Sequence, residues 1–359
     1  MTFSLNNFTT SVFLSHEIPD IEKINKDPKN VLLIADENTS KIADKIRKNC
    51  QLPLCIIKSG EENKNWQSVN TILENAVNAN LDRDSLFLGV GGGVICDLCG
   101  FAASIYMRGC RLALVPTTLL AMIDSSIGGK TGINNFGIKN LTGSFYPAQA
   151  VYMPFNVLLS LAPLEIKRGM AEMIKAAVLS ADDFFDLLTE LKDSVTDKKK
   201  QIDFSKLPKI DLFYKCIEKA ANFKGSIVCE DLYDTGRRML LNLGHTFGHA
   251  LESVTGPGKI THGEAVAWGI LRSCSLGCAL GITPKPRAQK IRDLIQSFGF
   301  CSTYPSIDSE ALFSAMKRDK KKKLEKLTFI VPDEISAKAV RLETESEFEL
   351  LKNILQNQD

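Results

Sequence analysis

The sequence predicts an α/β N-terminal domain with a Rossmann-like parallel sheet, followed by a mostly α-helical C-terminal domain. In the first half of the chain, short apolar runs alternate with segments of helical periodicity, which is typical of a parallel sheet covered by helices on both faces. Beyond about Tyr152 apolar residues recur at helical spacing, and the next run typical of a strand is 327–331. We therefore expect domains of residues 1–155 and 156–359, because 359 residues are enough for two cores.

Each expected element follows from a local pattern. The first apolar run ends at Asp36 and the third ends at Gly91, as buried strands end where polar or glycine residues begin. The strands expected in the first domain are 31–35, 54–57, 85–90 and 112–115, and the helices between them are 40–50, 66–79 and 97–105. In the second domain, helical periodicity predicts helices over 161–179, 184–192, 210–228, 248–255, 263–280 and 286–298.

Composition excludes several classes of protein. The formal net charge of +2 gives no global electrostatic reason to expect nucleic acid or a membrane as a partner. No apolar run approaches the roughly 20 residues of a membrane-spanning helix, and the N-terminus lacks the pattern of a signal peptide. The ten cysteines are expected to be small buried residues in a reducing cytoplasm, and the lone CxxC pair, Cys96 and Cys99, to serve packing.

Two glycine-rich segments suggest sites for anions. Residues 89–97, GVGGGVICD, run from a strand through glycines into a helix, which lets backbone N–H groups approach a pyrophosphate. Val94 breaks the strict GxGxxG spacing, so a tight structural turn is the alternative. Residues 124–132, DSSIGGKTG, lack the spacing of a phosphate loop, but a glycine-rich loop with Lys130 and Lys139 suits an anionic ligand better than a plain linker.

A histidine cluster is the strongest chemical signal. Three of the four histidines lie within 245–262, and His245 and His249 share a helix face because they are four residues apart. His262 opens the next expected helix. Histidines with an acidic residue from elsewhere form a common zinc set, and Glu172, in an apolar helix that also carries Lys175, is the candidate acid. Three protein ligands with an open position would make the zinc catalytic.

Basic residues near this cluster point to an anionic substrate. Arg238 and Asn242 are four residues apart, so helical spacing would direct both toward the histidines, and an arginine suits a carboxylate or phosphate. A surface arginine is the alternative. The run 317–323, KRDKKKK, is read as a solvated face, with closure over an anionic site or nucleic-acid binding as the alternatives.

At these residues the chain resembles the 3-dehydroquinate synthase family. The resemblance covers most of the chain, from Asp36 to Lys321, and its specific segments are GGGVICDLCGFAAS, VPTTLLAMIDSSIGGKTGIN, GMAEMIK, LNLGHTFGHALE and HGEAVAWG. It implies an NAD- and zinc- or cobalt-dependent cytoplasmic enzyme, a homodimer in many relatives. Its substrate would be a seven-carbon sugar-acid phosphate, 3-deoxy-D-arabino-heptulosonate 7-phosphate.

The resemblance also implies roles for individual residues. It implies zinc held by Glu172, His245 and His262. The implied NAD contacts are Asp36, Asn38, Glu61, Lys64, Gly92, Gly93, Asp97, Thr117, Thr118, Lys130, Lys139 and Ser160, the last standing where the family commonly has threonine. The implied substrate contacts are Asp124, Lys130, Lys139, Asn140, Lys175, Lys224, Arg238, Asn242, His249 and one lysine of the 320–323 segment, taken as Lys320.

The implied chemistry is a redox-neutral cyclisation. NAD takes a hydride from the substrate and later returns it, phosphate leaves in between, and an intramolecular aldol step closes the ring. The sheet domain would hold NAD, the helical domain would hold metal and substrate, and the cleft between them could close to exclude water. Three alternatives remain: a cyclase acting on a sugar phosphate without a carboxylate, a polyol dehydrogenase of the glycerol-dehydrogenase type, and a nucleic-acid-binding protein that uses the lysine run.

Overall fold

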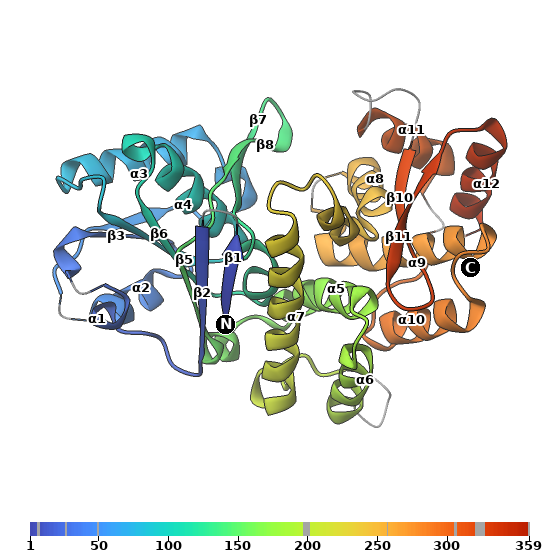
Figure 1. The fold of residues 1–359 in the computed structure, drawn as a ribbon, viewed down its shortest axis with the longest axis horizontal. Helices are drawn as coiled ribbons and strands as arrows, with labels where there is room; N and C mark the ends of the chain where they lie inside the picture. The colour runs from blue at the N-terminus through green and yellow to red at the C-terminus, as the bar shows by residue number, and fades with distance from the viewer. Residues whose placement is uncertain are drawn as a thin grey trace. The chain divides into compact units, whose positions relative to one another are not determined.

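The computed structural model divides the chain into two compact units (Figure 1). The first consists of Met1–Ile166 and Ile217–Tyr233, and the second of Lys167–Cys216 and Asp234–Asp359. The chain therefore leaves the first unit, returns to it for one helix, and leaves it again. The structure describes residues 1–5, 8–25, 27–48, 50–196, 202–256, 258–304, 307–319 and 327–357.

The first unit is built on a seven-stranded sheet with the strand order β1-β2-β9-β6-β5-β3-β4. All neighbouring strands pair in parallel except β1 and β2, which are antiparallel. The strands are β1 (Thr2–Leu5), β2 (Phe8–Ser15), β3 (Val31–Asp36), β4 (Leu54–Ile57), β5 (Leu86–Gly91), β6 (Arg111–Pro116) and β9 (Ala150–Pro154).

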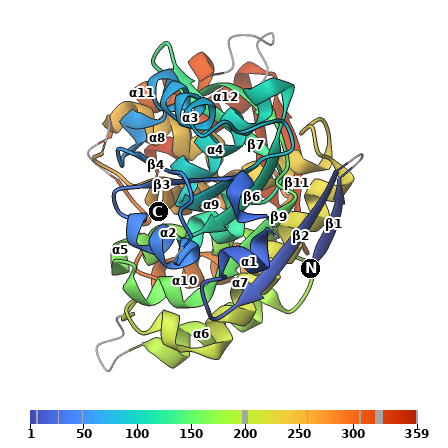
Figure 2. The ribbon, with the colours of Figure 1, turned by 90° about the vertical axis from the view of Figure 1, so that its left-hand side faces the viewer.

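The parallel sheet confirms the predicted fold class of this part of the chain. The four predicted strands correspond to β3, β4, β5 and β6, and β3 and β5 are buried along nearly their whole length. Helices cover both faces, with α1 (Ile21–Ile24) and α2 (Ser40–Arg47) on one and α3 (Trp66–Asn78) and α4 (Gly93–Ile105) on the other (Figures 1 and 2). One face of the sheet packs with α1 and α2 around Ile21, Leu33, Ile46 and Val90.

The expected glycine-rich loop is shorter than predicted and leads into a hairpin. A π-helical turn, Ala121–Ser125, precedes the loop 126–129, and β7 (Lys130–Asn135) follows it and pairs antiparallel with β8 (Ile138–Phe145). The loop prediction was correct for 126–129 and wrong for 130–132, which belong to the strand. Gly132 and Gly143 face each other across the hairpin, where a Cβ on either would meet the opposite backbone at less than 3 Å.

The second unit is largely helical, as predicted. Its longest fully internal helix, α9 (His262–Ala279), is buried along most of its length and packs with Phe247, Phe329 and Leu351 through Trp268. The long helices that cross the unit boundaries are α5 (Pro163–Leu179) and α7 (Asp211–Glu230). The remaining elements are α6 (Phe184–Val195), α8 (His245–Thr255), α10 (Lys285–Ser297), α11 (Ser309–Asp319), α12 (Glu345–Gln356), and the antiparallel strands β10 (Leu327–Pro332) and β11 (Ala337–Leu342).

Short 3₁₀ helices connect several of these elements: Pro28–Asn30, Glu61–Asn63, Tyr106–Arg108, Phe155–Ser160, Leu207–Lys209 and Arg237–Asn242. All ten cysteines lie in described parts of the chain, and each is a free thiol. Cys96 and Cys99 are buried in α4, where burial raises the pKa of each thiol, in agreement with a packing role. Within the described residues, no helix has both the length and the apolar character needed to cross a membrane.

Candidate metal centre and nucleotide site

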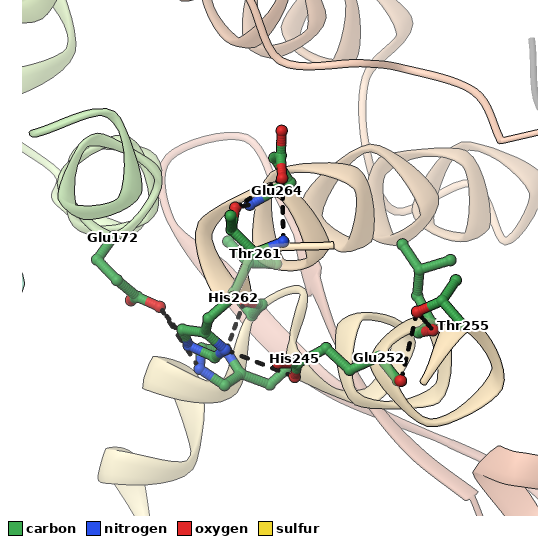
Figure 3. A network of polar contacts seen from close by, with 9 residues as sticks. Glu172, His245, Glu252, Thr255, Thr261, His262 and Glu264 are labelled. Atoms are coloured by element: carbon green, nitrogen blue, oxygen red, sulfur yellow. Dashed lines mark hydrogen bonds and ion pairs between the residues drawn. The ribbon is translucent and has the colours of Figure 1, made fainter. Parts of the chain in front are cut away.

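Three residues from three helices of the second unit converge on one point (Figure 3). Oε1 of Glu172 lies 3.6 Å from Nε2 of His245 and 3.4 Å from Nε2 of His262. One potential ligand atom from each residue lies within 4.8 Å of those of the other two. The structure thus brings together the three residues that the sequence singled out.

These distances fit a small cation better than direct hydrogen bonds. Nitrogen and oxygen ligands bind zinc at about 2.0–2.1 Å, so two ligands of a tetrahedral ion stand about 3.3 Å apart. The two observed separations, 3.4 and 3.6 Å, are close to that spacing and longer than a good hydrogen bond. Among the described residues, the cluster contains one carboxylate and two imidazoles, which is a donor set typical of catalytic zinc.

Local backbone features place the two histidines. His245 is the first residue of α8 and follows Gly244, whose φ of 80° is readily adopted only by glycine. His262 is the first residue of α9, where Thr261 and Glu264 form a capping box: Thr261 Oγ1 accepts from the Glu264 backbone, and the Glu264 carboxylate accepts from the Thr261 N–H at 3.0 Å. Each ligand therefore sits at a fixed helix start.

Glycines allow the three helices to approach. A Cβ at Gly263 of α9 would lie 2.6 Å from the Arg168 carbonyl oxygen of α5, the helix that carries Glu172. A Cβ at Gly269 would lie 2.0 Å from the Gly244 carbonyl oxygen, next to His245. Real Cβ atoms essentially never come within 3.0 Å of such atoms, so larger residues at these two positions would push the ligand-bearing segments apart.

The charge state of the cluster follows from its burial and its neighbours. Burial alone would raise the pKa of Glu172, but the ammonium of Lys175, with which it forms a buried ion pair, and the two histidines hold that pKa well below its usual range. Burial and the Lys175 charge lower the pKa of His245 to about 3. Burial would also lower the pKa of His262, but Glu172 and Glu252 outweigh it and raise that pKa to about 10. Glu172 and His245 thus already carry the protonation states that a cation requires, and His262 would release a proton on binding one.

The other candidate substrate-binding residues of the second unit differ in burial. His249 is exposed, with its ring centroid 5.4 Å from that of His245 and 6.3 Å from that of His262. Arg238 is buried and Asn242 is exposed, and both lie in a 3₁₀ helix. The expectation that these two share a face through α-helical spacing was wrong, because residues four apart in a 3₁₀ helix are turned by about a third of a turn.

The carboxyl edge of the parallel sheet gathers the residues expected to bind a nucleotide. β5 ends at Gly91, Gly92 caps the next helix, and α4 begins at Gly93, so the predicted strand–glycine–helix arrangement is present. A Cβ at Gly93 would lie 3.2 Å from the Ser125 hydroxyl, a buried group with no hydrogen-bond partner among the described residues. A helix start with close backbone approach and an unsatisfied hydroxyl suits a pyrophosphate.

Beside this helix, Lys64 links two other candidates. It is buried, it lies 2.5 Å from the Asp97 carboxylate, and it donates to the Asn140 side chain in β8. Burial raises the pKa of Asp97 to about 6, although the Lys64 charge acts in the opposite direction. Glu61 accepts from Asn134 of β7 at 2.9 Å, which ties the same turn to the hairpin.

The remaining candidates lie around the same edge or on the hairpin. Asp36 ends β3, Thr117 and Thr118 follow β6, and Asn38 is exposed in the turn after Asp36. Lys224 of α7 forms an ion pair with Asp124 and also donates to its backbone carbonyl at 2.6 Å. Lys130 and Lys139 are exposed on β7 and β8, Ser160 ends a 3₁₀ helix, and Lys320 lies outside the described residues.

Solved structures place this architecture in a class. The chain superposes on 2-epi-5-epi-valiolone synthase from Streptomyces hygroscopicus, solved with NAD+ and Zn2+ bound, with a TM-score of 0.83 over 99% of each chain. At 23% identity this likeness establishes the fold. The fold and the Glu–His–His cluster together define the class: a two-unit fold with a parallel-sheet unit and a helical unit that carries a candidate metal site.

Sequence relatives give the family. A family profile for the N-terminal part of 3-dehydroquinate synthase matches residues 54–168, and one for its C-terminal part matches residues 169–322. The chain is 42% identical to 3-dehydroquinate synthase of Prochlorococcus marinus over 279 residues, covering 78% of this chain and 74% of the relative. It is 36% identical to that of Campylobacter jejuni over 318 residues, covering 88% of each. The chain belongs to the 3-dehydroquinate synthase family of enzymes.

Proposed function

We propose that this enzyme converts 3-deoxy-D-arabino-heptulosonate 7-phosphate to 3-dehydroquinate and phosphate, a step of the shikimate pathway that leads to aromatic amino acids. The observation that carries the proposal is the Glu172–His245–His262 cluster in a chain of this family. A metal-binding group in the helical unit and a nucleotide-binding edge in the sheet unit are what a transient oxidation of a substrate alcohol needs.

The sheet unit would hold NAD. A bound NAD supplies a reversible hydride acceptor, so the net redox change of the reaction is zero. The α4 N-terminus, with Gly92 and Gly93, would bind the pyrophosphate through backbone N–H groups. Buried Lys64 keeps the Asp97 carboxylate in place beside that helix. We assign the other nucleotide contacts to Asp36, Asn38, Glu61, Thr117, Thr118, Lys130, Lys139 and Ser160.

The helical unit would hold zinc or cobalt through Glu172, His245 and His262. Such an ion supplies Lewis acidity that lowers the pKa of a bound substrate hydroxyl. The Lys175 ammonium, paired with Glu172, keeps that carboxylate ionised and oriented. We assign Lys175 and Asn242 to substrate hydroxyls and Arg238 to the substrate carboxylate, since a guanidinium can bind a carboxylate through two parallel hydrogen bonds.

Phosphate elimination requires cationic groups around the leaving group. We assign Lys130, Asn140, Lys224 and His249 to the phosphate, whose own oxygens can accept the neighbouring proton. Lys224 is paired with Asp124, so contact with phosphate involves an exchange or sharing of partners. Lys320 lies outside the described residues, and its assignment to the substrate rests on the family resemblance.

We also propose a cytoplasmic location and a homodimer. Ten free cysteines, six of them buried, support a reducing compartment. The open edge of the sheet at β1 and the exposed Phe8 and Phe13 on β2 are features that a second copy could cover. Light scattering of the purified protein tests the dimer, and a monomer at micromolar concentration would contradict it.

The decisive experiment measures phosphate release and NADH absorbance together, with purified protein, NAD, zinc and the heptulosonate phosphate. We expect phosphate release without accumulation of NADH, loss of activity after a chelator, and recovery when zinc is restored. NADH accumulation without phosphate release would instead indicate a polyol dehydrogenase. Turnover only with a sugar phosphate that lacks a carboxylate would indicate a different cyclase.

A further inference from the structure

The two histidines of the metal cluster are oriented alike. Nε2 of His245 and Nε2 of His262 both face Oε1 of Glu172, at 3.6 and 3.4 Å. The opposite ring nitrogen of each faces an oxygen outside the cluster. Nδ1 of His245 lies 3.3 Å from the Leu243 carbonyl oxygen. Nδ1 of His262 lies 3.6 Å from Oε2 of Glu252, and both residues are labelled in Figure 3.

Glu252 reaches this position from a predictable place on α8. It lies seven residues after His245 and three after His249, so all three occupy one helical face. Its side chain is only 18% exposed, which limits competition from water for the carboxylate. The Nδ1–Oε2 separation is slightly longer than a hydrogen bond, yet the negative charge faces the one ring position of His262 that the cluster does not use.

We propose that Glu252 is a positioning residue for the metal, which holds His262 with its proton on Nδ1 and its Nε2 lone pair directed at the ion. The inference rests on the proposed metal site and adds a residue outside the ligand set. A histidine that binds a metal through one nitrogen commonly donates from the other to a carboxylate or carbonyl, which fixes the tautomer and raises the basicity of the ligand. For His245 the backbone of Leu243 serves this purpose, whereas for His262 a replaceable side chain does.

The orienting contact at Nδ1 matters more for His262 than for His245, because the His262 side chain is more exposed. Its side chain is 37% exposed, compared with 16% for that of His245, so surrounding side chains confine its ring less. Its backbone is fixed by the capping box, but a cap does not determine rotation about the side-chain bonds. The carboxylate of Glu252 supplies an orienting interaction at the ring itself.

The test is zinc affinity of metal-free protein, measured by competition with a chromophoric chelator and without any turnover. We expect Glu252→Gln to weaken zinc binding by about 10- to 100-fold, the usual effect of losing such an outer partner. Glu252→Asp, which keeps the charge, should recover part of the loss. In the cobalt-loaded protein, the visible absorption of Glu252→Gln should change, because a reoriented His262 alters the ligand geometry.

Glu264→Gln is the matched control. It removes one negative charge two residues from His262, yet glutamine can still complete the capping box, so its zinc affinity should stay within about threefold of wild type. His262→Ala should abolish tight binding and thereby establish the site. If His262→Ala fails to bind zinc but Glu252→Gln keeps the wild-type zinc affinity and cobalt absorption, the role of Glu252 is overturned and the metal site stands. Failure of the wild-type protein to bind zinc would overturn the proposed metal site as well.

Discussion

Replacing Gly269 with alanine tests whether close helix contact sets the metal geometry. The new Cβ would start 2.0 Å from the Gly244 carbonyl oxygen and must move to about 3.4 Å, where ordinary van der Waals contact begins. About 1.4 Å must therefore open between α9 and the residue that precedes His245. Metal–ligand distances tolerate deviations of only about 0.2 Å, so even a fraction of this shift affects His245.

The expected magnitude combines two opposing effects. Alanine is favoured over glycine within a helix by about 1 kcal/mol. Overpacking a rigid contact costs about 1–3 kcal/mol and more where backbone must move, as it must here because the obstructing atom belongs to the main chain. We expect Gly269→Ala to lower the free energy of unfolding by about 1–3 kcal/mol and to weaken zinc binding at least tenfold.

The assay is denaturant unfolding of the metal-free protein together with a zinc titration. Ser275→Thr is the control, because it also adds one carbon to α9, at a half-buried position whose hydroxyl already bonds the Leu271 carbonyl. The control should remain close to wild type in both measurements. Wild-type stability and wild-type zinc affinity in Gly269→Ala would show that the two helices separate freely and would refute the reasoning.

Three further predictions follow from the site. Thr261→Ala and Thr344→Ala each remove one capping box and should each cost about 1 kcal/mol in unfolding experiments, but only the former should also weaken zinc binding, since it alone precedes a ligand. Arg238→Lys keeps the charge of a buried group but loses the planar fork, so kcat/KM should fall about 30-fold for a loss of about 2 kcal/mol, whereas the exposed Arg237→Lys should change it little. The pKa of Asp97 in the folded protein, about 6, lies above its unfolded value, so its contribution to stability is fully present below pH 4 and is lost as the pH rises through 6. The free energy of unfolding of wild type should therefore fall by up to about 3 kcal/mol between pH 4 and 7, relative to that of Asp97→Asn. Denaturant unfolding at several pH values measures both, and an equal pH dependence in the two proteins would contradict this.

The sequence was most informative where burial is complete. β3 and β5 are buried on both faces, so their apolar runs stood out, and the strand limits were predicted to within about one residue. The edge strands were missed because burial is partial: only Thr10 and Val12 of β2 are buried, while apolar Phe8 and Phe13 are exposed. Strand β9 was missed beside it, and its neighbours in the sheet are far away in the chain.

The metal cluster was predictable because its chemistry is rare in the chain, with three of four histidines in one stretch. Glu252 was missed although its spacing of seven residues from His245 and three from His249 was visible in the sequence. An acidic residue on a helix is common, and only the position of the His262 ring distinguishes this one. The 3₁₀ conformation around Arg238 was missed because a six-residue segment carries too little periodicity to separate the two helix types.

The return of α7 to the first unit has a consequence for biosynthesis. A Cβ at Gly225 of α7 would lie 2.1 Å from the ring of Phe3 in β1, so the first strand and this helix pack closely within one unit. Residues 167–216, which belong to the other unit, are translated between them. At about 5–20 residues per second, the nascent sheet unit waits several seconds after residue 166 for its last helix to emerge. During that interval Phe3 lacks its native contact with α7, which makes this stage of synthesis the one at which chaperone binding would protect the chain most.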